Sequence, residues 1–410
     1  MLFANCLTRD QWLASWLQSS QACILLFVLG LHLSSAIQPR DKVPEYLATY
    51  GIHVENHTIE TEDGYLLMAF RLPHHGAPVA LMQHGVLSSA WCWIDNEPSL
   101  APALEVYKMG YDVWLTNSRG NTFSRRHKAL QPHFSKEFWN FSFPDLGRKD
   151  VPANIDYILK HTKQATLSLI GHSQGTSQVF VALTDPSIRN FMQDRVNLFV
   201  ALSPITYMAK QSAKLFSVLS YLHFGTVCMD LWPLGFLDFA SVPEVANELC
   251  HLTDGKLCKI TVDIICGVSS EDSDAAITNV SAHFPAGTSM KSLDHYAQLI
   301  SDGGFRDYDY GASGNRKVYG SDTPPSFNLS SAAEVPVALF IGGNDDLGDV
   351  ADEERAAAEL PQASRVFTEV FNDFSHVTWI AGNRQSFQAW FPKMQTLLGK
   401  YNPVPKAVVV

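Results

Sequence analysis

The sequence predicts an α/β protein with a mostly parallel central sheet and helices on both of its faces. Short, continuous apolar runs occur at 79–82, 113–115, 167–170, 198–202 and 337–341. Amphipathic segments such as 151–160 and 176–184 lie between them. Strands that are buried on both faces have this continuous apolar character, and their alternation with helices is typical of a parallel sheet. Functional groups are then expected at the carboxyl ends of the strands.

The size and composition of the chain fit this fold class. Its 410 residues are 46% hydrophobic and 17% charged, so the chain can bury a large core. A formal net charge of −11 leaves no basic surface for nucleic acid, and no basic-aromatic interleaving is visible. No repeat of 20–50 residues is present. We therefore expect no nucleic-acid partner.

Residues 1–36 have the pattern of a signal peptide. An apolar run at 23–31 is followed by Ser34-Ser35-Ala36, a small-residue cleavage site. The segment before the run is long, and Arg9 is balanced by Asp10, so a signal anchor is the second interpretation. The run is too short to span a bilayer comfortably. We expect entry into the secretory pathway, toward secretion or a lysosome-like compartment, with no stable membrane span after signal removal.

Glycosylation sequons and cysteines also fit a secretory route. N-x-[ST] sequons occur at Asn56, Asn140, Asn279 and Asn328. Removal of the leader would leave an odd number of cysteines.

The pair that we expect to form a disulfide is Cys250 and Cys258, because they flank a short polar loop. The alternative is that both are small buried residues. No Cys/His cluster has metal-ligand spacing, so we expect neither a metal nor another cofactor.

The most informative motif is Gly-His-Ser-Gln-Gly at 171–175, directly after an apolar run and before an amphipathic one. A G-x-S-x-G sequence between strand and helix is typical of the nucleophile elbow of the α/β-hydrolase fold. The glycines let strand and helix approach closely, and the turn exposes the Ser173 hydroxyl. The alternative is an ordinary turn in which the serine caps the helix.

A serine hydroxyl becomes a nucleophile when a neighbouring imidazole takes its proton and a carboxylate orients that imidazole. In this fold the chain order is serine, acid, histidine. Beyond position 295 the sequence has one histidine, His376, which we predict to be the base. Asp345 follows the strand at 337–341 and a Gly-Gly pair, and it is the predicted acid. Asp346 and Asp349 are its rivals.

The oxyanion needs two backbone donors. One is the amide of Gln174, directly after the nucleophile, and the other should come from the loop after an early strand. Val86 is our choice there, with Leu87 as the alternative. His84 and His172 sit beside motif glycines, too early in the chain for the base, and we expect them to be structural.

The region from about 205 to 310 interrupts the strand–helix alternation. Between 215 and 240 its only charged residues are Asp230 and Asp238. Such a run can be a core helix, but its glycines and proline favour an inserted cap that presents an apolar surface to lipid. The predicted organisation is a signal peptide at 1–36, a hydrolase core at 37–204 and 311–400, a helical cap or lid at 205–310, and a tail at 401–410.

With these residues identified, the chain resembles the acid lipase family, which includes gastric and lysosomal acid lipases, over roughly residues 41 to 396. The motifs that carry the resemblance are at 61–67, 83–87, 110–122, 141–143, 150–153 and 285–289. The resemblance implies a triad of Ser173, Asp345 and His376, donors at Val86 and Gln174, a disulfide between Cys250 and Cys258, and a free thiol at Cys266.

The chain departs from this family at three places. The family usually has an Asn-His-Leu-Asp-Phe-like sequence around its histidine, whereas residues 375–379 read Ser-His-Val-Thr-Trp. The segment after Asp345 lacks the usual proline, and Cys228 has no counterpart.

These observations predict a serine lipase or esterase that hydrolyses a triacylglycerol or a sterol ester at an interface, and we expect a monomer. Two alternatives remain: a catalytically silent lipid-binding or storage protein on the same fold, and a small-ester carboxylesterase.

Overall fold

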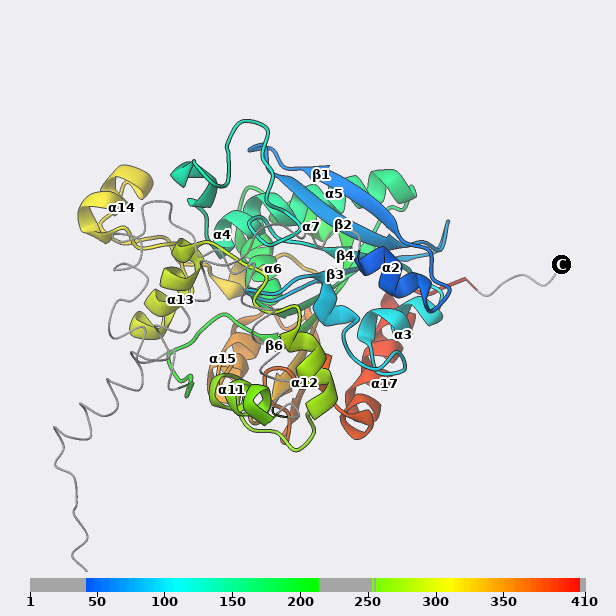
Figure 1. The fold of residues 1–410 in the computed structure, drawn as a ribbon. Helices are drawn as coiled ribbons and strands as arrows, with labels where there is room; N and C mark the ends of the chain where they lie inside the picture. The colour runs from blue at the N-terminus through cyan, green and yellow to red at the C-terminus, as the bar shows by residue number, and fades with distance from the viewer. Residues whose placement is uncertain (1–41, 214–252, 254–255, 406–410) are drawn as a thin grey trace, which may run out of the picture.

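The computed structural model describes residues 42–213, 253 and 256–405. Within these residues eight strands form one sheet in the order β1-β2-β4-β3-β5-β6-β7-β8 (Figure 1). The strands are β1 (Glu55–Glu60), β2 (Leu66–Leu72), β3 (Val79–Gln83), β4 (Asp112–Thr116), β5 (Leu167–Ser173), β6 (Val196–Pro204), β7 (Val337–Gly342) and β8 (Arg365–Phe371).

The sheet is parallel from β4 to β8, and only the β1–β2 and β2–β4 pairs are antiparallel. The predicted mostly parallel sheet is therefore confirmed. Each of the five apolar runs lies in one of the strands β3 to β7. Strands β1 and β8 lie at the two edges of the sheet and are half exposed, so their sequences carry polar residues instead of continuous apolar runs.

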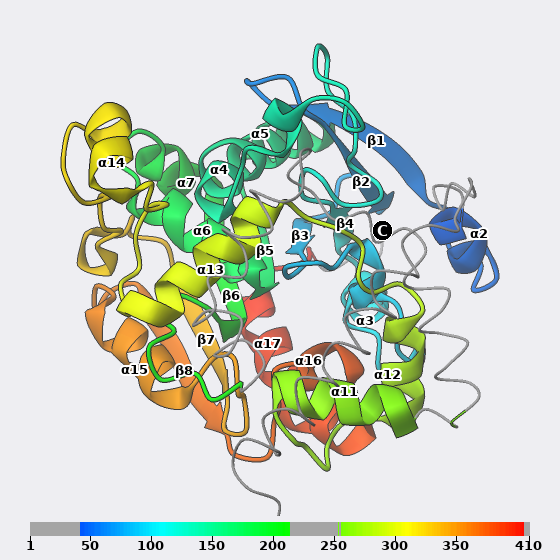
Figure 2. The same ribbon diagram turned by 60° about the vertical axis from the view of Figure 1, so that its left-hand side comes forward.

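The helices of the described residues cover both faces of the sheet (Figures 1 and 2). They are α2 (Lys42–Ala48), α3 (Pro102–Lys108), α4 (Phe143–Asp145), α5 (Val151–Thr162), α6 (Gln174–Thr184), α7 (Arg189–Arg195), α11 (Lys256–Cys266), α12 (Asp274–Ser281), α13 (Met290–Asp302), α14 (Gly311–Tyr319), α15 (Val350–Glu359), α16 (Thr378–Ala381) and α17 (Arg384–Tyr401). Shorter helical turns are η3 (Ala90–Trp93), η4 (Lys136–Trp139), η5 (Leu146–Asp150) and η6 (Leu329–Ser331).

Alternate residues of the strands belong to two separate hydrophobic clusters. In β6, Phe199 and Ala201 belong to the cluster that also contains residues of α5, α6, α7 and α15. Leu198 and Val200 belong to the cluster with α2, α3, α16 and α17. Because side chains alternate across a strand, these two clusters are the two faces of the sheet. Both faces are buried, which explains the continuous apolar runs.

Helices between β6 and β7 occupy the part of the chain where the sequence predicts a cap. Helix α13 is capped at its N-terminus by Ser289, whose hydroxyl accepts a hydrogen bond from the Ser292 amide, and at its C-terminus by Gly303 in a left-handed conformation. The strongly apolar stretch at 215–240 lies outside the described residues. The cap boundaries at 205 and 310 therefore stay a prediction. No helix in the described ranges is long and apolar enough to cross a membrane.

The described cysteines include one that is in a disulfide and two that are free thiols. Cys258 is disulfide-bonded, whereas Cys92 and Cys266 are free. Cys250, the predicted partner of Cys258, lies outside the described residues, as do Cys228 and the predicted signal peptide at 1–36. The asparagines of the four sequons, Asn56, Asn140, Asn279 and Asn328, are all exposed, and their glycosylation stays a prediction.

Candidate active site

The strand-to-helix turn at Ser173 has the conformation that the motif predicts. Strand β5 ends at Ser173 and helix α6 begins at Gln174. Ser173 has φ 55° and ψ −126°, a region that residues with a side chain rarely adopt. A Cβ at position 175 would lie 2.3 Å from the carbonyl oxygen of Gln83, and one at 171 would lie 2.9 Å from that of Gly175. The two glycines therefore permit the close approach of β3, β5 and α6 that holds the serine in this conformation.

The structure brings Asp345 and His376 into direct contact. Nδ1 of His376 lies 2.7 Å from Oδ2 of Asp345, and both side chains are almost fully buried. The other oxygen of Asp345 accepts hydrogen bonds from the amides of Leu347 at 2.9 Å and Gly348 at 2.7 Å. The carboxylate is thus fixed by the turn that follows β7, and it fixes the imidazole with the proton on Nδ1.

The second nitrogen of His376 is free to act as a base. Its Nε2 is buried and has no hydrogen-bond partner among the described residues. A buried nitrogen without a partner is uncommon in folded proteins and calls for a functional explanation. With Nδ1 protonated and held by Asp345, the lone pair on Nε2 is available to accept a proton, and no hydrogen bond within the described residues joins it to the Ser173 hydroxyl.

The two rival carboxylates have other partners. Asp346 accepts a hydrogen bond from the Ser212 hydroxyl. Asp349 caps helix α15 and accepts a hydrogen bond from the Ala351 amide at 2.9 Å. Of the three aspartates that the sequence offered, Asp345 is the one that contacts His376.

His172 joins the loop of His376 to the elbow. Its Nε2 lies 2.8 Å from the carbonyl oxygen of His376, and the two rings have centroids 5.1 Å apart. Since a carbonyl only accepts, this nitrogen carries the proton. Burial lowers the pKa of His172 to about 3, so the ring stays neutral. This contact gives His172 a structural role.

The loop after β3 lies against the nucleophile. A Cβ at Gly85 would be 2.9 Å from Cβ of Ser173 and 3.3 Å from its Oγ. Leu87, the next residue but one, has a φ of 58°. The amides of Val86 and Leu87 are thus on a tightly turned loop beside Ser173, and the amide of Gln174 begins α6. Their role as oxyanion donors stays a prediction.

His84 connects this loop to the segment after β4 through hydrogen bonds of both its ring nitrogens. Its Nδ1 donates to the carbonyl of Gly85 at 2.7 Å, and its Nε2 accepts from the amide of Ser118 at 3.1 Å. Burial lowers its pKa to about 4, in keeping with a neutral ring that has one donor and one acceptor.

Two asparagines that sequence reasoning did not assign also hold the loop. Asn117 accepts a hydrogen bond from the amide of Ala90 at 3.0 Å, and Asn121 donates to the carbonyl of Ser88. Both belong to the 110–122 motif. The sequence marked this motif as part of the family resemblance but did not indicate that its asparagines hold the loop after β3. The same motif contains Arg119, which is buried. Its guanidinium nitrogens lie 2.7 Å from a carboxylate oxygen of Asp63 and 2.7 Å from one of Asp150. These ion pairs connect three of the motifs that carried the resemblance.

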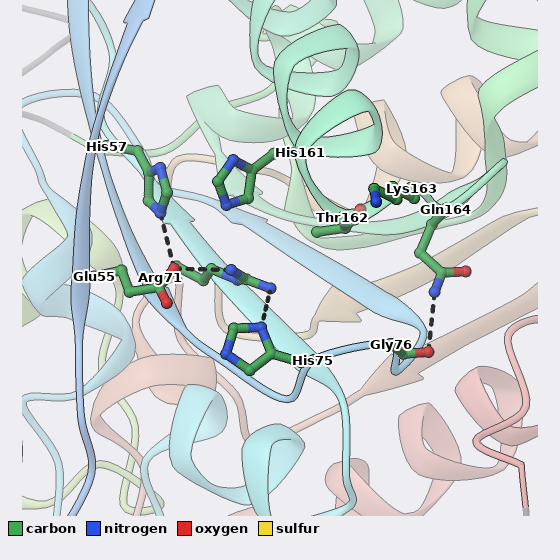
Figure 3. A pocket seen from close by; sticks show the side chains of 9 residues that line it. All are labelled: Glu55, His57, Arg71, His75, Gly76, His161, Thr162, Lys163 and Gln164. Atoms are coloured by element: carbon green, nitrogen blue, oxygen red, sulfur yellow. Dashed lines mark hydrogen bonds and ion pairs between the residues drawn. The ribbon is translucent and has the colours of Figure 1, made fainter.

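A second cluster of polar side chains comes from β1, β2, the segment before β3 and the end of α5 (Figure 3). Donor atoms of Glu55, His57 and His161 lie within 4.8 Å of one another beside a cavity of about 770 Å³. Nη1 of Arg71, however, is 2.8 Å from Oε2 of Glu55. Because this guanidinium already supplies a positive charge to the carboxylate, we assign no metal to the cluster.

Comparisons with known proteins show what the whole chain is similar to. A family model described as alpha/beta hydrolase fold matches residues 78–380, and one described as partial alpha/beta-hydrolase lipase region matches residues 43–97. Gastric triacylglycerol lipase from Homo sapiens is 35% identical over 355 residues, 82% of this chain and 86% of that protein. Lysosomal acid lipase/cholesteryl ester hydrolase from Homo sapiens is 31% identical over 406 residues, 92% of this chain and 97% of that protein. Lipase 1 from Drosophila melanogaster is 32% identical over 367 residues, 87% and 80% of the two chains.

Proposed function

The chain belongs to the acid lipase family of α/β-hydrolases, and we propose that it hydrolyses carboxylic esters of lipids through an acyl-enzyme on Ser173. The observation that carries the proposal is the state of His376. Its Nδ1 is fixed by Asp345 at 2.7 Å, while its buried Nε2 has no partner in the described part of the chain. An imidazole that is oriented by a carboxylate and keeps its second nitrogen unpaired supports a general-base role for His376.

The reaction proceeds by acyl transfer to water. The Oγ of Ser173 attacks the ester carbonyl while Nε2 of His376 takes the hydroxyl proton. Asp345 orients the imidazole and stabilises the imidazolium that forms. The amides of Val86 and Gln174 donate hydrogen bonds to the oxyanion. His376 then protonates the departing alcohol, and a water molecule, activated by the same imidazole, releases the fatty acid from Ser173.

The substrate class is supported by the relatives. The similar proteins are named as triacylglycerol lipases and as a cholesteryl ester hydrolase, and all of them are lipases. A triacylglycerol or a sterol ester, bound partly at an interface, is therefore the substrate that we propose for this chain. The same relatives and the leader-like sequence at 1–36 support a secretory route to a secreted or lysosome-like location.

Two alternatives remain testable. A lipid-binding protein without catalysis would keep the fold but not need an oriented, unpartnered imidazole. A small-ester carboxylesterase would use the same residues but prefer short acyl chains.

A chain-length profile separates the three functions. We expect p-nitrophenyl esters of long fatty acids and emulsified triolein to be hydrolysed by the wild type and not by Ser173→Ala. The control is Ser168→Ala on the same strand, whose hydroxyl contacts Asn197 and should leave turnover nearly unchanged. Activity confined to short esters would select the carboxylesterase. Lipid binding without turnover of any ester would select the silent binding protein.

A further inference from the structure

The turn that carries His376 is held through two hydroxyl groups, one on each side of the histidine. The Ser375 hydroxyl accepts a hydrogen bond from the amide of Val377 at 3.3 Å and donates to Oδ2 of Asp272 at 2.8 Å. The Thr378 hydroxyl accepts from the amide of Ser375 at 2.9 Å and donates to Oδ1 of Asp272 at 2.5 Å. Both backbone amides that flank His376 are thus linked through a hydroxyl to one carboxylate.

Asp272 comes from a segment that packs firmly against this turn. It lies between α11 and α12 and is 8% exposed. The segment is tied to the same part of the core by the Ser269 hydroxyl, which donates to the carbonyl of Asp373. The amide of Ser273 donates to the carbonyl of Ala381 at 2.8 Å, on the other side of the turn. The carboxylate is therefore anchored independently of the side chains that it binds.

The chemistry of the two hydroxyls, which lie 3.2 Å from each other, favours a carboxylate at this place. Each hydroxyl already accepts a hydrogen bond from a backbone amide, so its own proton is left to be donated to another acceptor. Two such protons need two acceptor oxygens that face the same side, and an ionised carboxylate provides them. An asparagine would offer one acceptor and would direct an NH₂ group at the second hydroxyl.

We propose that Asp272 is a positioning residue for His376, and that its carboxylate holds the turn in the conformation that keeps the imidazole hydrogen-bonded to Asp345. This role rests on the proposed function. It also accounts for a departure noted in the sequence, because Ser375 and Thr378 are two of the residues at which the turn differs from the family pattern.

The test compares Asp272→Asn with Asp274→Asn, an exposed aspartate in the first turn of α12. A soluble p-nitrophenyl ester is the substrate, and kcat and KM are measured separately. We expect Asp272→Asn to lower kcat about 10- to 100-fold with KM within about 2-fold, since misplacement of a catalytic group by about 1 Å can cost 100-fold. The control should keep both constants. An Asp272→Asn protein with wild-type kcat overturns the positioning role.

A second pair of variants decides the question where Asp272→Asn does not fold. Thr378→Val is close in shape to threonine but removes the hydroxyl, whereas Thr378→Ser keeps it. We expect a loss of kcat in the first variant and restoration in the second. Equal activity of the two refutes the role. A wild type that turns over no ester would instead refute the proposed function itself.

Discussion

The side chain of His172 donates a hydrogen bond from Nε2 to the main-chain oxygen of His376 at 2.8 Å. The two residues are 204 positions apart in the sequence. One precedes the predicted nucleophile and the other is the predicted base, so this contact fixes the end of β5 to the turn after β8. The glycine of the loop after β3 is close by, because a Cβ at Gly85 would lie 3.5 Å from Nδ1 of His172.

We predict that His172→Phe lowers kcat by on the order of 10-fold while the protein stays folded. The phenyl ring fills the same space but leaves the carbonyl of His376 without a donor, at a cost of about 1–3 kcal/mol. Ester turnover and thermal unfolding are measured together. The exposed His133→Phe is the control. Unchanged turnover in His172→Phe would show that the contact does not position the base.

Replacement of Asp345 should affect turnover far more than replacement of its neighbour. Asp345→Asn removes the charge that stabilises the imidazolium and favours the wrong tautomer of His376, so we expect a loss of about 10⁴-fold in kcat. Asp346→Asn keeps a side chain that can still accept from Ser212 and should remain within a few-fold of wild type. Similar losses in both variants would mean that the acid has been misassigned.

The elbow glycine should be sensitive to a single methyl group. The Cβ of Gly175→Ala would lie 2.3 Å from one backbone oxygen and 3.0 Å from another, and neither can move without shifting β3. We expect urea unfolding to show a loss on the order of 3 kcal/mol or more. Gly399→Ala in helix α17, with nothing within 4 Å of the new Cβ, should instead gain about 0.5–1 kcal/mol. A neutral Gly175→Ala would contradict the close approach.

The pH dependence of stability should report on Asp272. Burial raises its pKa to about 6 from an ordinary 3.8, although the hydrogen bonds from Thr378 and Ser375 lower it. Between these values the folded protein holds a proton that the unfolded chain has lost, so the contribution of Asp272 to stability falls as pH rises.

The measurement is the difference in unfolding free energy between the wild type and Asp272→Asn. Relative to the variant, the wild type should lose roughly 3 kcal/mol between about pH 4 and pH 7, because one pKa unit corresponds to about 1.4 kcal/mol. A difference that stays constant across this range would mean that the carboxyl is not held in a buried environment.

The sequence predicted the parts of the molecule that follow from burial and chain order. Continuous apolar runs identified β3 to β7, because those strands are covered on both faces. The order rule and a single late histidine selected His376, and a Gly-Gly turn after a strand selected Asp345, which the structure places in contact with it. Their catalytic roles stay predictions until they are tested in solution.

Other features depend on tertiary contacts that no local pattern reveals. Asp272 lies more than 100 positions before the turn that it holds, and nothing around it marks it apart from other loop aspartates. Asn117 belonged to a recognised motif, but its role becomes visible only when Ala90 is placed against it. Edge strands β1 and β8 carry polar residues because one side of each meets solvent, so their sequences lack the apolar signal.

The most direct test of the account is the site and rate of covalent labelling by a fluorophosphonate, followed by mass spectrometry of the digested protein. We predict one adduct, on the peptide that contains Ser173, formed at least about 1000-fold more slowly in His376→Asn because that variant lacks the imidazole that takes the hydroxyl proton. An adduct on a different residue, or labelling of His376→Asn at the wild-type rate, would contradict the claim that this imidazole activates Ser173.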